Sequence, residues 1–312
     1  MKKMIILTGP TGVGKTNLSI ELAKQLSSEI VSADSMQIYR GMDIGTGKIR
    51  PEEMQGIPHH MLDILEPDEA YSVEEYRKTA LQVMDEIHDR GKMPLVVGGS
   101  GLYINGLLYE LNFSIAPPNE GLRDYYIQLE EERGRGWLHG ILEKVDPLSA
   151  ERIHPNQQKR IIRALEVYDQ TGRPFSSFND YVNRYREDLD VVYLLLERPR
   201  EQLYRRIEKR VDSMIEEGLV REVSGLVERG YGAHLQSMQG IGYKEILGHI
   251  LEGVSLEESI ELLKRNTRRY AKRQVTWFER EEKKVRIQLS ESDSVDAVLE
   301  ECLHILKGFG WS

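Results

Sequence analysis

A glycine-rich stretch near the amino terminus has the residue types and spacing of a phosphate-binding loop. It satisfies the pattern G-x-x-x-x-G-K-[ST] with Gly9, Pro10, Thr11, Gly12, Val13, Gly14, Lys15 and Thr16. The glycines let successive N–H groups turn inward, Lys15 supplies a cation, and the Thr16 hydroxyl can ligate Mg²⁺. The pattern indicates a site for a diphosphate or triphosphate with Mg²⁺ as the cofactor, but it does not identify the molecule that carries the phosphates.

Such a loop usually holds ATP, so a small-molecule kinase is one interpretation. A kinase of this type normally adds an acidic metal anchor where a second apolar strand ends. Here the strand expected at residues 93–97 runs into Gly98, Gly99 and Ser100. The kinase interpretation is weakened but stays open.

Asp34, in the stretch SADSMQ, is a second residue that could do chemistry. It ends an apolar segment, residues 29–34, that we expect to be a strand. Because the carboxyl ends of parallel strands meet at one edge of a sheet, Asp34 should lie on the same edge as the glycine-rich loop. A carboxylate there can act as a general base, although ADS is also suited to a turn that Asp34 would cap.

The elements that must position these residues alternate between strands and helices. Apolar runs predict strands at residues 4–8, 29–34, 93–97, 191–196 and 284–289. A helix should follow the glycine-rich loop, and others are expected at residues 256–280 and 295–307. This succession predicts an α/β fold with a parallel sheet core flanked by helices, similar to that of P-loop NTPases.

The pattern changes between residues 113 and 190. This segment has APP at residues 116–118, helical periodicity without strong strand signals, and a polar loop at TGRPFSSFND. We therefore expect a mostly helical insertion domain at 113–190 and an α/β core built from 1–112 and 191–312.

Charge is distributed unevenly along a chain that is acidic as a whole. With 42 Lys and Arg against 51 Asp and Glu, the formal net charge is −9. The segment KRNTRRYAKR carries no acid, and its cations are Lys264, Arg265, Arg268, Arg269, Lys272 and Arg273. Their i, i+1, i+4, i+5 spacing gathers them on one side of a helix. This basic stripe predicts contact with nucleic acid, while pairing with acids elsewhere is open for some members.

Several function classes are disfavoured. Cys302 is the single cysteine, which argues against disulfides and thiolate zinc sites. The longest apolar runs are too short for a membrane span, and Gly9 interrupts the amino-terminal apolar segment before a signal peptide is complete. We expect a cytoplasmic protein that does not bind membranes. His59 and His60, without a third ligand nearby, are interpreted as structural residues on a loop.

Taken together, the motifs resemble the tRNA dimethylallyltransferases, also called tRNA isopentenyltransferases. The similar segments follow the family's order and cover nearly the whole chain: GPTGVGKT at 9, SADSMQIYRGMDIGTGK at 32, PHHMLDILEPDEAYSVEEY at 58, VVGGSGLYINGLL at 96, IHPNQQKRIIRALEVY at 153, RVDSMIEEGLVREV at 210, GIGYKEI at 240 and RRYAKRQVTWFER at 268. Some relatives, chiefly eukaryotic ones, append a zinc finger. The resemblance implies a bacterial-type member, because this chain ends at Ser312 with one cysteine.

The resemblance implies that the loop holds dimethylallyl diphosphate. The dimethylallyl group would pass to N6 of the adenosine 3′ of the anticodon in tRNA, with release of diphosphate and Mg²⁺ as cofactor. The partner would be the anticodon stem-loop, with no obligate protein partner. A close rival is an adenylate dimethylallyltransferase acting on a free nucleotide, for which the basic stripe and the insertion are unnecessary. A non-enzymatic RNA-binding protein would leave Asp34 unexplained.

Site residues follow from the matching positions. The resemblance implies that Asp34 deprotonates the amine, that Thr11 contacts the bridging oxygen of the diphosphate, and that Arg210 contacts the diphosphate. Arg210 stands in a crowded basic helix, so a solvated face is the alternative for it. The expected tRNA contacts are Asp34, Ser35, Met36, Gln37 and Ser100, then Gln157, Gln158, Lys159, Arg160 and Ile161, and from the basic stripe Arg268, Arg269, Lys272 and Arg273.

Overall fold

The computed structural model describes residues 1–110, 116–181 and 184–311. The chain forms two compact units by its internal contacts. One comprises Met1–Leu107 and Glu187–Ser312, and the other comprises Leu108–Arg186. The first unit contains the sheet, and the second is mainly helical.

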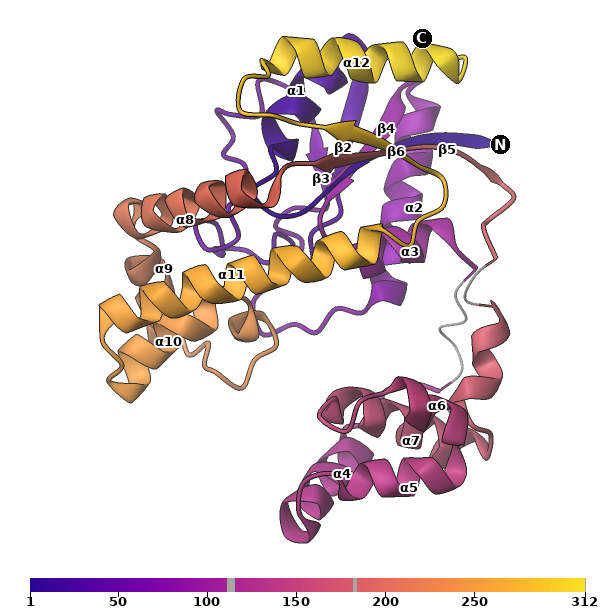
Figure 1. Ribbon diagram of the computed structural model, residues 1–312, viewed down its shortest axis with the longest axis vertical. Helices are drawn as coiled ribbons and strands as arrows, with labels where there is room; N and C mark the ends of the chain where they lie inside the picture. The colour runs from indigo at the N-terminus through magenta and orange to yellow at the C-terminus, as the bar shows by residue number, and fades with distance from the viewer. Residues whose placement is uncertain (111–115, 182–183, 312) are drawn as a thin grey trace. The chain divides into compact units, whose positions relative to one another are not determined.

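A six-stranded sheet forms the centre of the first unit, in the order β3-β2-β4-β1-β5-β6 (Figure 1). Its strands are β1 (Lys2–Thr8), β2 (Ser28–Ser32), β3 (His59–His60), β4 (Met93–Gly98), β5 (Leu189–Glu197) and β6 (Lys284–Gln288). All neighbours pair in parallel, and central Ile6 lies opposite Val96 on one side and Tyr193 on the other. The predicted α/β fold with a parallel sheet is confirmed, and the strands' carboxyl ends share one edge.

Two local expectations were wrong at β2 and its neighbour. The strand β2 ends at Ser32, so Asp34 lies just beyond it. His59 and His60 form the edge strand β3 instead of a loop. His59 Nδ1 lies 2.8 Å from the carbonyl oxygen of Ile57, and His60 Nε2 lies 2.7 Å from the carboxylate of Glu29. These contacts give both histidines structural partners.

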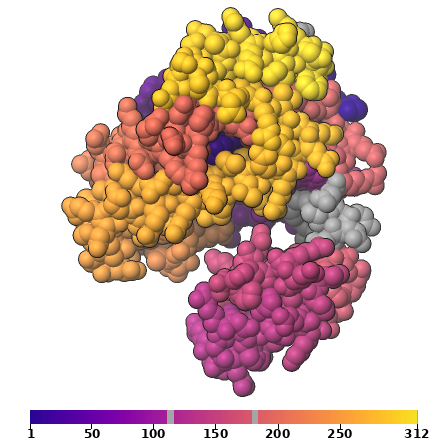
Figure 2. All heavy atoms as spheres, viewed as in Figure 1, coloured from indigo at the N-terminus to yellow at the C-terminus, as the bar shows by residue number. Residues whose placement is uncertain are grey.

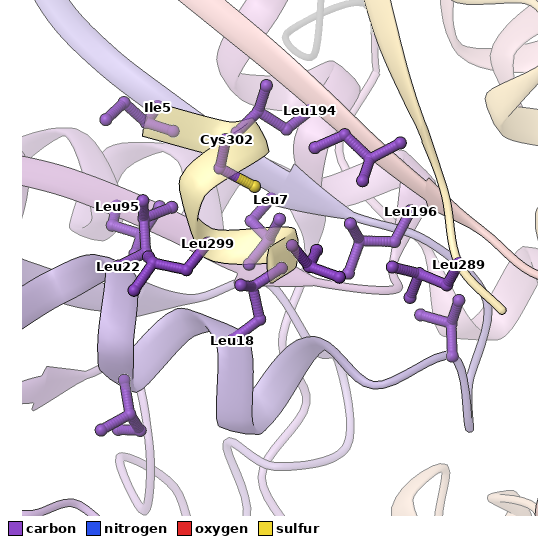
Figure 3. Close-up of a cluster of buried hydrophobic side chains, with 14 of the residues drawn as sticks. Ile5, Leu7, Leu18, Leu22, Leu95, Leu194, Leu196, Leu289, Leu299 and Cys302 are labelled. Carbon is purple, nitrogen blue, oxygen red and sulfur yellow. The ribbon is translucent and has the colours of Figure 1, made fainter. Parts of the chain in front are cut away.

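Helices cover both faces of the sheet (Figure 1). The helices α1 (Lys15–Gln25) and α12 (Val295–Gly308) pack together on one face, and α2 (Val73–Asp89) and α3 (Gly101–Leu108) lie on the other. Leu22 of α1 and Leu299 and Cys302 of α12 meet Leu7 and Leu194 of the sheet in a buried cluster (Figure 3). Burying each large apolar side chain contributes about 1.5–3 kcal/mol, so this cluster holds the glycine-rich loop on a rigid base.

A helical layer follows β5 and consists of α8 (Arg200–Glu217), α9 (Leu219–Glu228), α10 (Tyr243–Glu252) and α11 (Leu256–Phe278). The helices α8 and α11 run side by side (Figure 1). Gly218 separates α8 from α9 with φ 104, a left-handed conformation that glycine adopts without strain. The side chain of Ser255 caps α11 by accepting the N–H of Glu258 at 3.2 Å, which explains why that helix begins there.

The second unit contains α4 (Glu120–Arg133), α5 (Trp137–Val145), α6 (Pro147–Arg152), α7 (Gln158–Thr171) and a 3₁₀ helix at Phe175–Tyr181. Its own core includes the fully buried Leu138, Leu142 and Ile161. Within the described residues, no helix has both the length and the apolar character needed to cross a membrane.

Candidate active site

The glycine-rich loop joins β1 to α1 and forms one wall of a cavity of about 800 Å³. Gly9 passes so close to β5 that a Cβ there would lie 2.5 Å from the carbonyl oxygen of Leu196. Gly14 precedes α1 with φ 118 and has no side chain to cap it, so the N–H groups of the first helical turn are available to an anion. The wall therefore has the features of a phosphate site.

Lys15 is folded over this loop. Its ammonium group donates to the carbonyl oxygens of Gly9 at 2.8 Å and Pro10 at 3.0 Å. Desolvation lowers the pKa of Lys15 to about 8, Asp34 opposes that shift, and Arg210 adds to it. These three charged groups thus act on one another across the cavity.

Asp34 lines the same cavity. Its Oδ1 accepts the N–H of Met36 at 2.9 Å, so the turn that the ADS sequence suits does form. One carboxylate oxygen is engaged in this bond, and the second can still accept a proton. The turn therefore does not exclude a role as general base.

Ser100 joins the Asp34 turn to the end of β4. Its hydroxyl accepts the N–H of Ser35 at 2.9 Å and donates to the hydroxyl of Ser35 at 3.2 Å. On the other side of the turn, the side-chain amide of Gln37 lies 3.5 Å from the carbonyl oxygens of Thr46 and Gly47. The segment 34–37 is thus tied to two other loops.

The helix α8 directs Arg210 into the cavity. The guanidinium donates to the carbonyl oxygen of Thr46 at 3.2 Å, and burial lowers the pKa of Arg210. Arg205, which lies on the outer side of α8, pairs with Glu291 at 2.6 Å instead. One turn before Arg210, Arg206 donates to the carbonyl oxygen of Gly12 at 2.8 Å and also lines the cavity. No role of Arg206 was predicted from the sequence.

Gln274 of α11 links two loops with one buried amide. Its Oε1 accepts the N–H of Thr11 at 2.9 Å, and its Nε2 donates to the carbonyl oxygen of Gly99 at 2.9 Å. Only glycine leaves room for this bond, because a Cβ on residue 99 would lie 2.4 Å from Nε2. Tyr270, one turn earlier, has its pKa raised to about 12 by desolvation and by Asp34. Sequence reasoning missed both residues.

The cavity opens between α8 and α11, where Figure 2 shows a hollow with amino-terminal atoms in indigo at its base. It brings together many of the expected site residues: Thr11, Gly12, Gly14, Lys15, Thr16, Asp34, Ser35, Met36, Gln37, Arg210 and Arg273. The side chain of Val13 is instead fully buried in the core beneath the loop.

The basic stripe divides into paired and exposed cations. Lys264 lies 2.7 Å from Asp212, and Arg268 lies 2.6 Å from Glu208. Arg265, Arg269, Lys272 and Arg273 are exposed, and Arg273 also lines the cavity.

The expected RNA-contacting segment of the second unit is the start of α7. Gln157, Lys159 and Arg160 are exposed there, and Gln158 is partly buried. The Ile161 side chain is fully buried in the unit's own core, so it is not available for contact with RNA.

Known proteins resemble this chain over almost its whole length. A curated protein from Alkaliphilus oremlandii, named tRNA dimethylallyltransferase, is 48% identical over 98% of both chains. One of the same name from Geobacillus kaustophilus is 52% identical over 89% of this chain and 87% of that protein.

Solved structures agree with this likeness. The tRNA delta(2)-isopentenylpyrophosphate transferase of Staphylococcus epidermidis has a TM-score of 0.73 at 42% identity and covers 99% of both chains. A eukaryotic dimethylallyltransferase acting on tRNA has a TM-score of 0.83 at 31% identity, over 99% of this chain and 79% of that one. A family model described as IPP transferase matches residues 37–281. The extent of that match and the near-half identity over the full length show that this chain belongs to the IPP transferase family.

Proposed function

We propose that this chain transfers the dimethylallyl group of dimethylallyl diphosphate to N6 of the adenosine 3′ of the anticodon in tRNA. The observation that carries the proposal is the shared cavity, which is lined by Asp34, a phosphate loop and two partly buried cations, Lys15 and Arg210. A prenyl transfer from a diphosphate needs this combination of a base and an anion site. A small-molecule kinase would not need the exposed basic helix.

The donor would bind with its diphosphate on the glycine-rich loop. The loop N–H groups, Lys15, Arg206 and Arg210 offer donors to the phosphate oxygens, and Thr11 stands at the loop's cavity side. The lining also has an apolar part, which includes Val211, Met214, Ile241 and Leu263. We assign the dimethylallyl tail to this apolar part, because binding there removes the hydrocarbon from water.

Mg²⁺ fits the donor set of this site. Thr16 presents a hydroxyl oxygen at the start of α1 and lines the cavity together with Asp34. Among the described residues, no group of three or more His, Cys, Asp or Glu side chains could hold a metal ion. A magnesium ion commonly takes few protein ligands and completes its shell with phosphate oxygens and water. It would stabilise the charge that develops on the diphosphate.

The transfer breaks the bond between C1 of the dimethylallyl group and the bridging oxygen and forms a bond between C1 and N6. The lone pair of an adenine amine is delocalised, so the amine is a weak nucleophile. Asp34 would accept the N6 proton as attack proceeds, which contributes about 10²- to 10⁴-fold. Lys15 and Arg210 would stabilise the departing diphosphate, where negative charge builds up.

The tRNA would be bound at several places. We assign Ser35, Met36 and Gln37 to the target nucleotide, because they line the cavity beside Asp34, and we add Ser100, whose hydroxyl accepts the N–H of Ser35. The exposed cations of α11 suit the RNA backbone, and the exposed start of α7 suits the anticodon stem-loop.

The test offers labelled dimethylallyl diphosphate and Mg²⁺, without ATP, to an anticodon stem-loop, to AMP or to no acceptor. We expect transfer to the stem-loop with the higher kcat/KM. A preference for AMP would support the adenylate dimethylallyltransferase, and a strict need for ATP hydrolysis would support the kinase. Either result would reject the proposal.

A further inference from the structure

Glu222, on α9, holds the loop of residues 43–47 from outside the cavity lining. Its carboxylate accepts three successive backbone N–H groups, from Asp43 at 3.0 Å, Ile44 at 2.7 Å and Gly45 at 3.1 Å. The hydroxyl of Tyr243 donates to the same carboxylate at 2.6 Å. Successive N–H groups that converge on an anion form a strong, directional cradle.

The backbone at residues 46 and 47, at the other end of this loop, supports Arg210. The carbonyl oxygen of Thr46 accepts from the Arg210 guanidinium at 3.2 Å. Gly47 has φ 59, and a Cβ there would lie 1.7 Å from Nη2 of Arg210. The guanidinium therefore rests directly on the backbone of Thr46 and Gly47, and a shift of this backbone must move it.

Close packing makes the connection from Glu222 to Arg210 stiff. Tyr243 is fully buried, and a Cβ on Gly45 would lie 2.6 Å from its ring. At the end of the loop, the buried ammonium of Lys48 donates to the carbonyl oxygen of Tyr39 at 2.7 Å and to the carboxylate of Asp43 at 2.6 Å. Lys48 thus holds one end of the loop, and the Glu222 carboxylate holds the backbone of residues 43–45.

We propose that Glu222 is a positioning residue for the transfer reaction, which acts by seating Arg210 against the departing diphosphate. The inference rests on the proposed function, since that function gives Arg210 a diphosphate to bind. Glu222 does not line the cavity and acts only through the loop. A misplacement of about 1 Å at a charge-stabilising group costs up to about 10²-fold in rate. Because charge develops on the diphosphate during the reaction, the loss should fall on kcat more than on KM.

The experiment is a double-mutant cycle of Glu222→Gln with Arg210→Ala. The amide of Gln keeps one acceptor oxygen but places an NH₂ group where the loop or Tyr243 also donates, so part of the cradle is lost with little change of volume. We expect Glu222→Gln to lower kcat by roughly 10- to 100-fold in the wild-type background and by less than about threefold when Arg210 is already Ala. Glu228→Gln, an exposed substitution on the same helix, is the matched control and should leave kcat unchanged.

A second readout separates this inference from the proposed function. Binding of inorganic diphosphate, measured by calorimetry, needs no acceptor and no transfer. Glu222→Gln should weaken diphosphate binding in the protein that keeps Arg210 but not in the Arg210→Ala variant. If the wild type transferred nothing to RNA, the proposed function would fail, while the binding cycle would still test Glu222.

Equal losses in both backgrounds, or no loss in either, would overturn the inference. Equal losses would mean that Glu222 only supports the fold. If Glu222→Gln does not fold, Tyr243→Phe serves instead, because it removes one donor to Glu222 and keeps the buried ring. Its effect on diphosphate binding should likewise disappear in the Arg210→Ala protein, and persistence of the effect there would reject the inference.

Discussion

Neutralising the exposed cations of α11 should reduce the salt dependence of RNA binding by an amount that the structure sets. Arg269, Lys272 and Arg273 are exposed, whereas Arg268 is held by Glu208 at 2.6 Å. Each cation that neutralises a phosphate contributes about 0.7 to 0.9 to the slope of log K against log salt. Replacing Arg269, Lys272 and Arg273 by Gln should therefore flatten the slope by up to about 2 to 3 units.

Fluorescence anisotropy with a labelled anticodon stem-loop measures this slope. Between about 50 and 200 mM salt, the triple variant should lose roughly 20- to 40-fold less affinity than the wild type. The matched control exchanges both members of an ion pair, Arg268→Gln with Glu208→Gln. It preserves the net charge and should leave the slope nearly unchanged.

Two results would refute this reasoning. A slope for the triple variant within about half a unit of the wild type would mean that Arg269, Lys272 and Arg273 do not bind RNA phosphates. A slope that falls by about 0.7 to 0.9 in the paired control would mean that Arg268 leaves Glu208 to bind a phosphate.

Three further predictions concern single residues of the cavity. Asp34→Asn should lower the single-turnover rate by roughly 10²- to 10⁴-fold while the affinity for the stem-loop, measured in parallel, is kept; a near-normal rate would remove Asp34 from the mechanism. Because desolvation lowers the pKa of Lys15 to about 8, the negative charge of a bound diphosphate should raise that pKa again. Calorimetry in two buffers should then show proton uptake and an affinity that falls as pH rises through about 8, and the same pH dependence in Lys15→Met would contradict this origin. Gln274→Leu leaves the N–H of Thr11 without its acceptor and should lower the free energy of unfolding in urea by about 1–3 kcal/mol, whereas the exposed substitution Val275→Ala should change it little.

Much of the fold could be predicted because its strands carry strong local signals. Runs of apolar residues between turn residues mark β1, β4 and β5, and their alternation with helices requires a parallel sheet. The strand β3 could not be predicted, because two residues are too short to show a period and its hydrogen bonds come from β2. The strand predicted at residues 29–34 runs past Ser32 because the buried Ala33 continues the apolar pattern of β2.

The candidate site was predictable only where a motif marks it. The glycine-rich loop, Asp34 and Arg210 each stand in a motif of the family, and the structure brings them to one cavity. Gln274 and Glu222 also lie in segments that match the family, but those segments do not indicate which residues they contact. The bond from Gln274 to Thr11 spans 263 positions, and the bonds from Glu222 to the loop span 177 to 179. No local pattern reports contacts at that separation, so they follow only from tertiary packing.

The most direct test of the central claim compares two stem-loops that differ only in the exocyclic amine of one purine. One carries adenosine 3′ of the anticodon, and the other carries a purine without the exocyclic amine at that position. With dimethylallyl diphosphate and Mg²⁺ alone, single-turnover reactions analysed by mass should show one dimethylallyl group on the adenosine stem-loop and none on the other. Transfer to both stem-loops, or to neither under conditions where AMP is modified, would contradict the account.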